Sequence, residues 1–483
     1  MKRSRYFRIS GAASVLLIGL LASPKESAAS GYLTARFGTD HGTPAMANGF
    51  AVYFNPGALG GTTGTTITGD LSVLARFARY TRTSDALSPS DESYRNDPGY
   101  VNANQGTANL SNVLALPYVG INTDFGTKNL RAGWAAYIPF GGLASWDRRE
   151  GVAGSPGSVD GVSRWHNISG QILSIYNTFA VAYKITPSLS VGASISPVFH
   201  TVSTVRARNA DGSDDTVTPA GDLVEGRSLL EAHGINFAAS AGVYWEPTET
   251  LHLGLSYNSQ PGFGTSRLSG TLRTQLGSGQ ESKSDIDFLQ TLPDIIRFGG
   301  QYQVNRRLDV KADFEFVRWS VFDKQCVVEK GADCAVADDG RRLPGPEGQR
   351  VQLNVPRNWN NAIGVRAGPG YMLTDDLEGF GSVGFTTPAV PKSTIDASTI
   401  DSQRLYFTLG AKYRFSKHFA LAGSYNHIYF FPVNTNGANN QDLGANPAKS
   451  PGGGDYNVSR SPSADGRYRS QIGFLNVNVA YTF

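Results

Sequence analysis

The chain has 483 residues and a nearly balanced charge: 43 Lys or Arg residues against 40 Asp or Glu residues, for a net charge of +3. This balance argues against a nucleic-acid-binding protein, which would carry a basic excess. Only 40% of the residues are hydrophobic, whereas 56 are glycine and 11% are aromatic. The hydrophobic share is below the usual globular range of roughly 45–50%, yet a disordered chain would not carry so many aromatic residues. The composition therefore favours a large all-β protein.

The first residues have the composition of a secretory signal peptide. A basic start is followed by an apolar run over residues 11–22 and then by small residues that suit cleavage, Ser27, Ala28 and Ala29. A retained membrane anchor is the alternative, but the run is shorter than the roughly 20 residues that a spanning helix needs. We predict that residues 1–29 are removed and that the mature chain is exported. Since no later stretch approaches roughly 18 consecutive apolar residues, any membrane span would be built from strands.

Several segments alternate between apolar and polar residues with a period of two, which is typical of strands with one apolar and one polar face. In 473–483, Leu475 and Val477 alternate with Asn476 and Asn478. A soluble sandwich would alternate as well, but the polar face is charged over several of these segments, as a water-lined lumen permits. The other alternating segments are 405–415 and 308–316, with weaker ones at 251–257, 235–245 and 189–195.

The expected connections alternate between tight turns and long loops, which is the layout of an outer-membrane barrel. Six tight turns are expected near residues 125–128, 186–187, 246–248, 305–306, 375–376 and 416–417. Seven long loops are expected near 81–112, 147–168, 208–229, 268–289, 323–358, 387–402 and 433–466. Together they predict an all-β, transmembrane antiparallel β-barrel of about 14 strands over residues 62–483. Aromatic residues near strand ends are expected in girdles at the membrane interfaces: Tyr257, Trp319, Tyr413 and Tyr481.

Residues 30–61 precede the first convincing strand and belong to none. This segment combines small residues with apolar side chains that seek burial, including Phe37, Phe50, Tyr53 and Phe54. In a barrel the lumen is the protein-lined space in which they can be buried. We therefore predict that residues 30–61 form a plug inside the lumen, which is incompatible with an open diffusion pore.

This segment resembles the N-terminal hatch of the FadL/TodX family, the long-chain fatty acid and hydrocarbon transporters of Gram-negative outer membranes. The likeness rests on the run Ala51-Val52-Tyr53-Phe54-Asn55-Pro56-Gly57-Ala58-Leu59, where the family typically shows Asn-Pro-Ala. This chain inserts Gly57 before Ala58, so the turn after Pro56 can differ. Further similar stretches follow in the same order along the chain: Leu292-Pro293-Asp294, Val317-Arg318-Trp319-Ser320, residues 385–391 and the last strand.

The resemblance implies a transporter of the outer membrane rather than an enzyme. Family members bind hydrophobic molecules outside the cell and release them sideways into the membrane, through a gap where the third strand kinks inward. The implied partners are hydrophobic small molecules (fatty acids, alkanes or aromatics), outer-membrane lipid and the barrel assembly machinery, which would read the terminal aromatic Phe483. The implied binding or gating residues of the hatch are Ser30, Gly31, Tyr32, Leu33, Phe37, Asn55 and Pro56.

A candidate for the wall opening is visible without the resemblance. Within 130–146 the alternation is interrupted by Pro139, Phe140, Gly141 and Gly142. Proline cannot donate a ladder hydrogen bond, and consecutive glycines weaken and bend a strand. An unpaired backbone group in hydrocarbon costs several kcal/mol, so such a sequence is tolerable where the wall opens onto protein or water. The alternative is an ordinary bulge at the barrel rim.

No cofactor or metal is expected. The seven histidines lack metal-ligand spacing, and residues 452–454, three glycines, lack the context of a phosphate loop. Cys326 and Cys334 share one long loop, so that an exported chain would join them in a disulfide. The charged residues Asp309, Lys311, Asp313, Glu315, Lys412 and Arg414 could steer a carboxylate headgroup, but a solvated lumen wall is the reading that we favour.

Three other functions stay open at this point: a porin, which the plug disfavours; a barrel enzyme, for which no nucleophile and base can be singled out; and an adhesive surface protein, for which the polar loops offer material. Long-chain fatty acids, alkanes and monoaromatic compounds all fit as substrates.

Deletion of Ser30 to Leu33 should change ligand binding or release, because movement at the start of the hatch opens the route in the family. The measurement is uptake of a labelled hydrophobic substrate by cells that express the deletion variant at the wild-type level. Uptake at the wild-type rate would contradict a role of Ser30 to Leu33 in gating.

Overall fold

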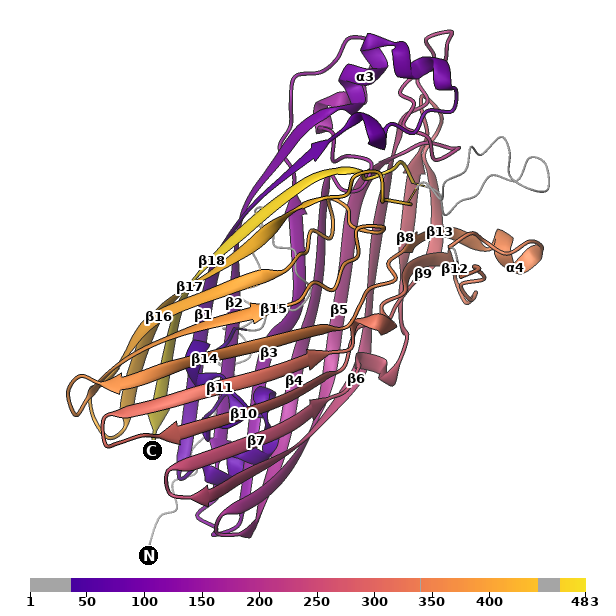
Figure 1. The fold of residues 1–483 in the computed structure, drawn as a ribbon. Helices are drawn as coiled ribbons and strands as arrows, with labels where there is room; N and C mark the ends of the chain where they lie inside the picture. Colours follow the sequence, from indigo (N-terminus) through magenta and orange to yellow (C-terminus); the bar gives the residue numbers. More distant parts are fainter. Residues whose placement is uncertain (1–35, 339, 442–460) are drawn as a thin grey trace, which may run out of the picture.

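The computed structural model describes residues 36–338, 340–441 and 461–483 (Figure 1). The expected signal peptide, residues 1–29, and the hatch residues Ser30, Gly31, Tyr32 and Leu33 lie outside the described part. No helix among the described residues is long and apolar enough to cross a membrane.

Strands dominate the structure and close into a 14-stranded antiparallel barrel, as the alternation predicted. The ring closes because the first strand pairs with the last, with Asp70 opposite Asn478. In order around the wall the strands are β1 (Thr65–Arg82), β2 (Gly106–Thr123), β3 (Leu130–Ser145), β4 (Ser169–Thr186), β5 (Leu189–Arg208), β6 (Gly226–Thr248), β7 (Leu251–Asn258), β10 (Ile295–Gln303), β11 (Leu308–Val317), β14 (Ala362–Met372), β15 (Leu377–Thr386), β16 (Arg404–Arg414), β17 (Phe419–Asn434) and β18 (Gly466–Thr482).

The two faces of the strands have the chemistry that a barrel in lipid requires. Apolar side chains are exposed on the outer face, for example Leu409 at 75% and Leu475 at 62%. Their neighbours along the strand, such as Thr408 and Asn476, face the lumen and are buried. The alternation follows from the strand period of two, and the closed ladder pairs backbone groups that hydrocarbon could not solvate.

One rim carries the tight turns and the other carries the long connections. The strand pairs β2–β3, β4–β5, β6–β7, β10–β11, β14–β15 and β16–β17 are joined by short turns. The opposite rim carries short helices: α3 (Pro98–Asn104) and α4 (Pro346–Gln349), with 3-10 turns η3 (Ser84–Ala86), η4 (Glu92–Asn96), η5 (Pro156–Asp160), η6 (Pro261–Phe263) and η7 (Trp319–Val321). Figure 1 shows α3 at this rim, opposite the end at which the C-terminus lies.

Two of the segments expected as loops, 268–289 and 323–358, contain further strands. They are β8 (Ser266–Gln275), β9 (Ser282–Gln290), β12 (Lys324–Glu329) and β13 (Val351–Pro356). The reason is the length of β6, which pairs with β7 only from Ser240 onward. Its earlier part, from Arg227 to His233, offers a free edge that β8 occupies, and β9, β12 and β13 extend the sheet. This four-stranded extension leaves the barrel at the loop-bearing rim (Figure 1).

The described residues before β1 form a compact plug in the lumen, which we call the hatch (36–64). It consists of η1 (Thr39–His41), α2 (Ala51–Phe54) and η2 (Pro56–Gly61), seen in indigo within the half of the barrel that carries the tight turns (Figure 1). Pro56 occupies the start of η2, where its missing N–H costs nothing. The Asn55 side chain caps η2 by accepting a hydrogen bond from Gly57 N at 3.0 Å.

Glycines of the wall let the hatch backbone approach the strands closely. A methyl group added to Gly242 of β6 would lie 1.9 Å from Asn55 Oδ1, and one added to Gly192 of β5 would lie 2.4 Å from the carbonyl carbon of Pro56. Asn55 also donates to Val243 O at 2.9 Å. The Asn-Pro motif therefore both shapes η2 and fixes it against the wall.

The substitution Gly242→Ala should loosen the hatch, because the added methyl group displaces Asn55. The displaced Asn55 side chain loses its hydrogen bonds, which should lower the free energy of unfolding by about 1–3 kcal/mol. Proteolysis of the hatch in detergent-solubilised protein should become faster, and ion conductance in planar bilayers should rise. Gly423→Ala is the matched control, since the nearest atom to its added methyl group is Asn476 O at 3.9 Å. Equal hatch proteolysis in the two variants would contradict the docking role.

Candidate functional site

Charged residues of the wall bind the hatch rather than line an open pore. Arg366 donates to the carbonyl oxygens of Thr39 at 2.9 Å and Gly42 at 3.1 Å, and it pairs with Asp313 at 2.7 Å. Arg297 pairs with Glu315 at 2.7 Å. These are charge-assisted bonds in a buried setting, where they are stronger than at a surface.

A second charged group joins η1 to β11 and β15. Glu378 lies 3.1 Å from His41 Nε2 and 3.3 Å from Lys311 Nζ, and Lys311 is also 3.4 Å from Asp309. Lys311 is 5% exposed. The expected solvated lumen wall is therefore wrong for Lys311, because the hatch fills the space in which water would otherwise solvate it.

Beneath the hatch, a polar cavity of about 560 Å³ opens between η1, η2 and the ends of the strands. Its lining includes Lys412, Arg414, Lys417 and His418 together with Glu378. Lys412 and Arg414, which the sequence placed on the polar face of one strand, thus lie on the side of the hatch that faces the tight turns.

Aromatic side chains join the hatch to β2 and β3. The Phe37 ring is 5.3 Å from Tyr118 and 5.5 Å from Tyr137, and Tyr53 is 5.0 Å from Tyr137, all between ring centroids. Tyr118 also donates its hydroxyl to Gly49 O at 2.5 Å. The hatch residue Phe37 therefore packs next to the last paired residues of β2 and β3.

The ladder between β2 and β3 is interrupted part of the way along both strands. It runs from Thr123 opposite Ala132 to Tyr118 opposite Tyr137 and then stops. Beyond it, β2 continues on β1 alone, and β3 resumes on β4 at Phe140 after a register shift. A single bridge between Leu110 and Trp146 closes the far end. Residues 111–117 and 138–145 thus border an opening in the hydrogen-bonded wall, which we call the β2–β3 opening.

At this opening β3 leaves the cylinder of the wall and enters the lumen. Residues 135–141 are all buried, whereas the other strands of the barrel wall largely alternate. Phe140 lies 6.3 Å from Trp319, which follows β11 across the barrel. The sequence expectation that Trp319 belongs to an interfacial girdle is therefore wrong: it is 4% exposed and packs in the interior against Phe322 and Trp359. Tyr257, Tyr413 and Tyr481 are between 42% and 45% exposed on the outer face.

A mostly apolar cavity of about 100 Å³ lies at the loop-bearing end, on the other side of the hatch. It lies between the ends of β3 to β6 and the four-stranded extension, and its apolar lining includes Leu143, Ile172, Val202, Leu230, Phe288, Val327 and Leu353. His166, Arg206 and Arg357 lie at the same cavity. Burial lowers the pKa of His166 to about 4, so that this imidazole is neutral near pH 7.

The sequence analysis missed this cavity because part of its apolar wall, including Phe288, Val327 and Leu353, comes from β9, β12 and β13, which are short. A signal was present in the alternation of Asp285, Asp287 and Leu289 with Ile286 and Phe288. Only the pairing of β8 with the free edge of β6 brings these residues to the mouth of the barrel.

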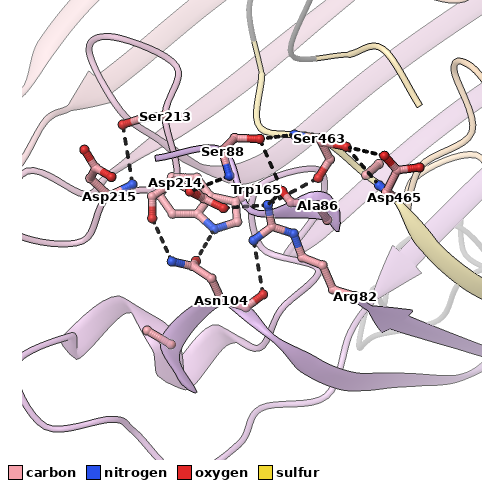
Figure 2. A network of polar contacts seen from close by, with 12 residues as sticks. Arg82, Ala86, Ser88, Asn104, Trp165, Ser213, Asp214, Asp215, Ser463 and Asp465 are labelled. Atoms are coloured by element: carbon pink, nitrogen blue, oxygen red, sulfur yellow. Dashed lines mark hydrogen bonds and ion pairs between the residues drawn. The ribbon is translucent and has the colours of Figure 1, made fainter. Parts of the chain in front are cut away.

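A buried polar network joins the loops above the barrel (Figure 2). Arg82, at the end of β1, pairs with Asp214 at 2.7 Å, and both side chains are fully buried. Arg82 also donates to Ala86 O at 2.6 Å and to Ser463 O at 3.2 Å. Its donors therefore join the loops after β1, β5 and β17.

Asn104, which ends α3, connects this network to the loop after β3. Its Oδ1 accepts from Trp165 Nε1 at 2.9 Å and from Arg164 Nη2 at 3.0 Å, and its Nδ2 donates to Asp214 O at 2.8 Å (Figure 2). Arg164 forms a second fully buried ion pair with Glu225 at 3.0 Å. Apart from Arg82 Nε, which has no partner, the polar groups named here are buried and bonded, and the network joins the loops over this side of the mouth.

The two cysteines form a disulfide in the four-stranded extension, with Cα atoms 6.2 Å apart. Cys326 lies on β12, and Cys334 follows that strand. The bond closes the end of the hairpin and lies apart from the hatch and the β2–β3 opening.

Three features together are those of an outer-membrane transport protein. They are a closed barrel with a lipid-compatible outer face, a hatch in its lumen and an apolar cavity above that hatch. The comparisons with known proteins agree. The family described as "Outer membrane protein transport protein (OMPP1/FadL/TodX)" matches residues 28–483. The chain belongs to this family, and it is an outer-membrane β-barrel protein of a Gram-negative bacterium.

Individual relatives are distant. Outer membrane protein P1 of Haemophilus influenzae is 23% identical over 273 residues, which are 51% of this chain and 54% of that protein. A putative outer membrane protein of Neisseria meningitidis, NMB0088, is 20% identical over 54% of this chain and 53% of its own length. The chain thus spans about half the length of the curated relatives that it matches.

Solved structures share the fold over nearly the whole chain. A Pseudomonas aeruginosa FadL homologue superposes with a TM-score of 0.71 at 15% identity and covers 95% of this chain and 100% of its own. The Ralstonia pickettii toluene transporter TbuX gives a TM-score of 0.59 at 14% identity, covering 91% of this chain and 98% of its own.

Proposed function

We propose that this protein imports long-chain fatty acids or related hydrocarbons, which bind in the lumen and leave sideways through the β2–β3 opening into the outer membrane. The observation that carries the proposal is the interrupted ladder beyond Tyr118 and Tyr137. Pro139, Phe140, Gly141 and Gly142 lie at this interruption and are the proposed lateral gate. Phe37, Asn55 and Pro56 hold the hatch beside it, and Ser30 to Leu33 are the proposed moving part of the hatch.

The polarity of the two cavities supports a sideways rather than an axial exit. The cavity above the hatch is mostly apolar, whereas the cavity beneath it has a mixed lining with several charged side chains, among them Glu378, Lys412 and Arg414. A fatty acid chain gains about 0.8 kcal/mol for each CH₂ group removed from water. Passage through the lower cavity into an aqueous periplasm would reverse this gain, but passage into the bilayer would keep it.

The local structure of β3 makes an opening physically tolerable. In hydrocarbon each unpaired backbone group costs several kcal/mol, so an interrupted ladder facing lipid would be destabilising. The inward course of residues 135–141 instead places this part of β3 among protein side chains. An ordinary bulge at the rim would retain pairing on both sides, and here the pairing with β2 is lost.

Two substrate classes compete. The structural neighbours TbuX and TodX are described as toluene transporters, and small neutral aromatics would suit the apolar cavity. A long-chain fatty acid combines an apolar chain with a carboxylate and would use cationic groups of the lumen as well.

Expression in a host that lacks its own fatty acid transporter should give uptake of labelled oleate above the empty-vector control. Toluene and a medium-chain alkane are tested in parallel to separate the two substrate classes. Folding is checked by heat-modifiable migration of the barrel. Failure of a folded barrel to import any of the three compounds would contradict the proposed function.

Substitutions that make β3 a regular strand at the proposed lateral gate should block release of the ligand without abolishing its binding. The triple variant Pro139→Thr, Gly141→Val and Gly142→Val restores strand-forming residues and ladder donors. We expect uptake to fall by about tenfold or more, equivalent to about 1.4 kcal/mol, while the affinity of the purified protein for the ligand is retained.

Pro197→Thr is the matched control for the gate, because Pro197 lies in β5, where pairing with β6 continues in register. This variant should transport like the wild type. If the gate variant imports ligand at the wild-type rate, release does not use the β2–β3 opening.

A further inference from the structure

Three arginines form a basic patch on the outer wall, at the loop-bearing end of the seam between β1 and β18. Arg79 of β1 lies directly opposite Arg469 of β18 in the ladder, and Arg467 lies two residues from Arg469 on the same face. All three residues are exposed. Residues directly opposite in an antiparallel pair have Cβ atoms about 4.5–5.5 Å apart, so like charges at these positions destabilise the sheet. We call these three residues the seam arginines.

No carboxylate among the described residues pairs with the seam arginines. Arg79 Nε donates to Asn109 Oδ1 at 3.1 Å. The acid beside this asparagine, Asp147, accepts from Asn109 N at 2.8 Å and from Asn109 Nδ2 at 3.0 Å. Other exposed arginines at this end do have an acid, since Arg148 and Arg273 each lie within 3.5 Å of a carboxylate. The seam arginines therefore carry positive charge that the described protein groups do not neutralise.

The patch begins where the apolar outer face of the wall ends. On β1 the outward row is uncharged from Ile67 to Phe77, and Arg79 is its next member. From Ile67 to Phe77 the strand advances about 34 Å, at about 3.4 Å for each residue. With a strand tilt of about 40°, this is about 26 Å along the barrel axis, which matches the apolar band of about 25 Å in outer-membrane barrels. Because the long loops of such barrels are extracellular, the seam arginines lie at the headgroup level of the outer leaflet.

Exposed aromatic rings lie next to the seam arginines on the side of the apolar band. Phe77 of β1 and Tyr429 of β17 flank Gln471 of β18, which is the outward residue next to Arg469. Phe77 is 49% exposed and Tyr429 is 40% exposed. Aromatic rings at this level of a barrel contact the boundary between acyl chains and headgroups. A lipid with a negatively charged headgroup would thus find cations and an apolar surface in the matching order.

We propose that the seam arginines bind a phosphate group of lipopolysaccharide, the phosphorylated glycolipid of the outer leaflet, whose acyl chains lie along Phe77 and Tyr429. A guanidinium binds phosphate oxygens in bidentate geometry. A phosphate shared by Arg79 and Arg469 also offsets the repulsion between them, so that the lipid stabilises the seam at which the barrel closes. The site faces the membrane rather than the lumen, and it does not depend on the proposed transport function.

The test is equilibrium binding to the purified full-length barrel in detergent, with lipid A, the membrane anchor of lipopolysaccharide, as the probe. Its diphosphorylated, monophosphorylated and dephosphorylated forms are compared with identical acyl chains. The wild type should bind the diphosphorylated form most tightly. The double variant Arg79→Gln and Arg469→Gln should bind that form about tenfold or more weakly and should bind the dephosphorylated form like the wild type. Arg467→Gln should act in the same direction with a smaller effect.

The temperature of heat-modifiable migration gives a second readout that a merely structural role would not produce. Without lipid, the double variant should unfold at the wild-type temperature or above it, because the substitutions remove two opposed like charges. With diphosphorylated lipid A, the wild type should become the more heat-resistant of the two proteins. The absence of this reversal would contradict a bound phosphate at the seam.

The matched control is the double variant Arg95→Gln and Arg273→Gln. It removes two exposed positive charges at the same end, where Arg95 pairs with Glu92 and Arg273 pairs with Glu281 within 2.8 Å. This variant should bind all three lipid forms like the wild type. Equal affinity of the seam variant and the wild type for diphosphorylated lipid A, or equal losses for the phosphorylated and dephosphorylated forms, would overturn the proposal. Stabilisation of the wild type by inorganic phosphate as large as that by lipid A would overturn the assignment to a lipid.

Discussion

The structure depends on one constraint: a backbone that crosses hydrocarbon must pair its own N–H and C=O groups, since lipid offers no replacement. The closed antiparallel ring of β1 to β18 meets this requirement nearly everywhere. The exception between β2 and β3 is therefore informative. Its backbone groups are tolerated because β3 turns into the lumen, where Tyr137 and Phe140 are packed among aromatic residues of the hatch, the wall and the loop after β11.

The hatch gives the lumen two different ends. The larger cavity beneath it has a mixed lining with several charged side chains, and the cavity above it is mostly apolar. The buried pairs of Arg297 and Arg366 stabilise this boundary by fixing the hatch, which fits the general rule that buried charges require good geometry and satisfied partners.

The loop-bearing end combines rigid and apolar parts. Arg82 and Asn104 join loops that are far apart in the sequence into one cover over the mouth. The long β6 and its sheet extension form the remaining wall and contribute Phe288 and Val327 to the apolar cavity. A hydrophobic molecule thus meets an apolar surface at the side of the mouth.

The sequence by itself determined the barrel, its strand number and the place of the wall interruption. Each of these depends on local chemistry: a period of two in 405–415, tight turns at one rim, and a proline with two glycines at 139–142. It also indicated the hatch, because apolar residues before β1 need burial. Only the tertiary structure decided which side chains meet. Trp319 looked like a girdle residue until the inward course of β3 brought Phe140 against it. Such contacts join residues hundreds of positions apart, and their pairing depends on register and closure, which no local pattern encodes.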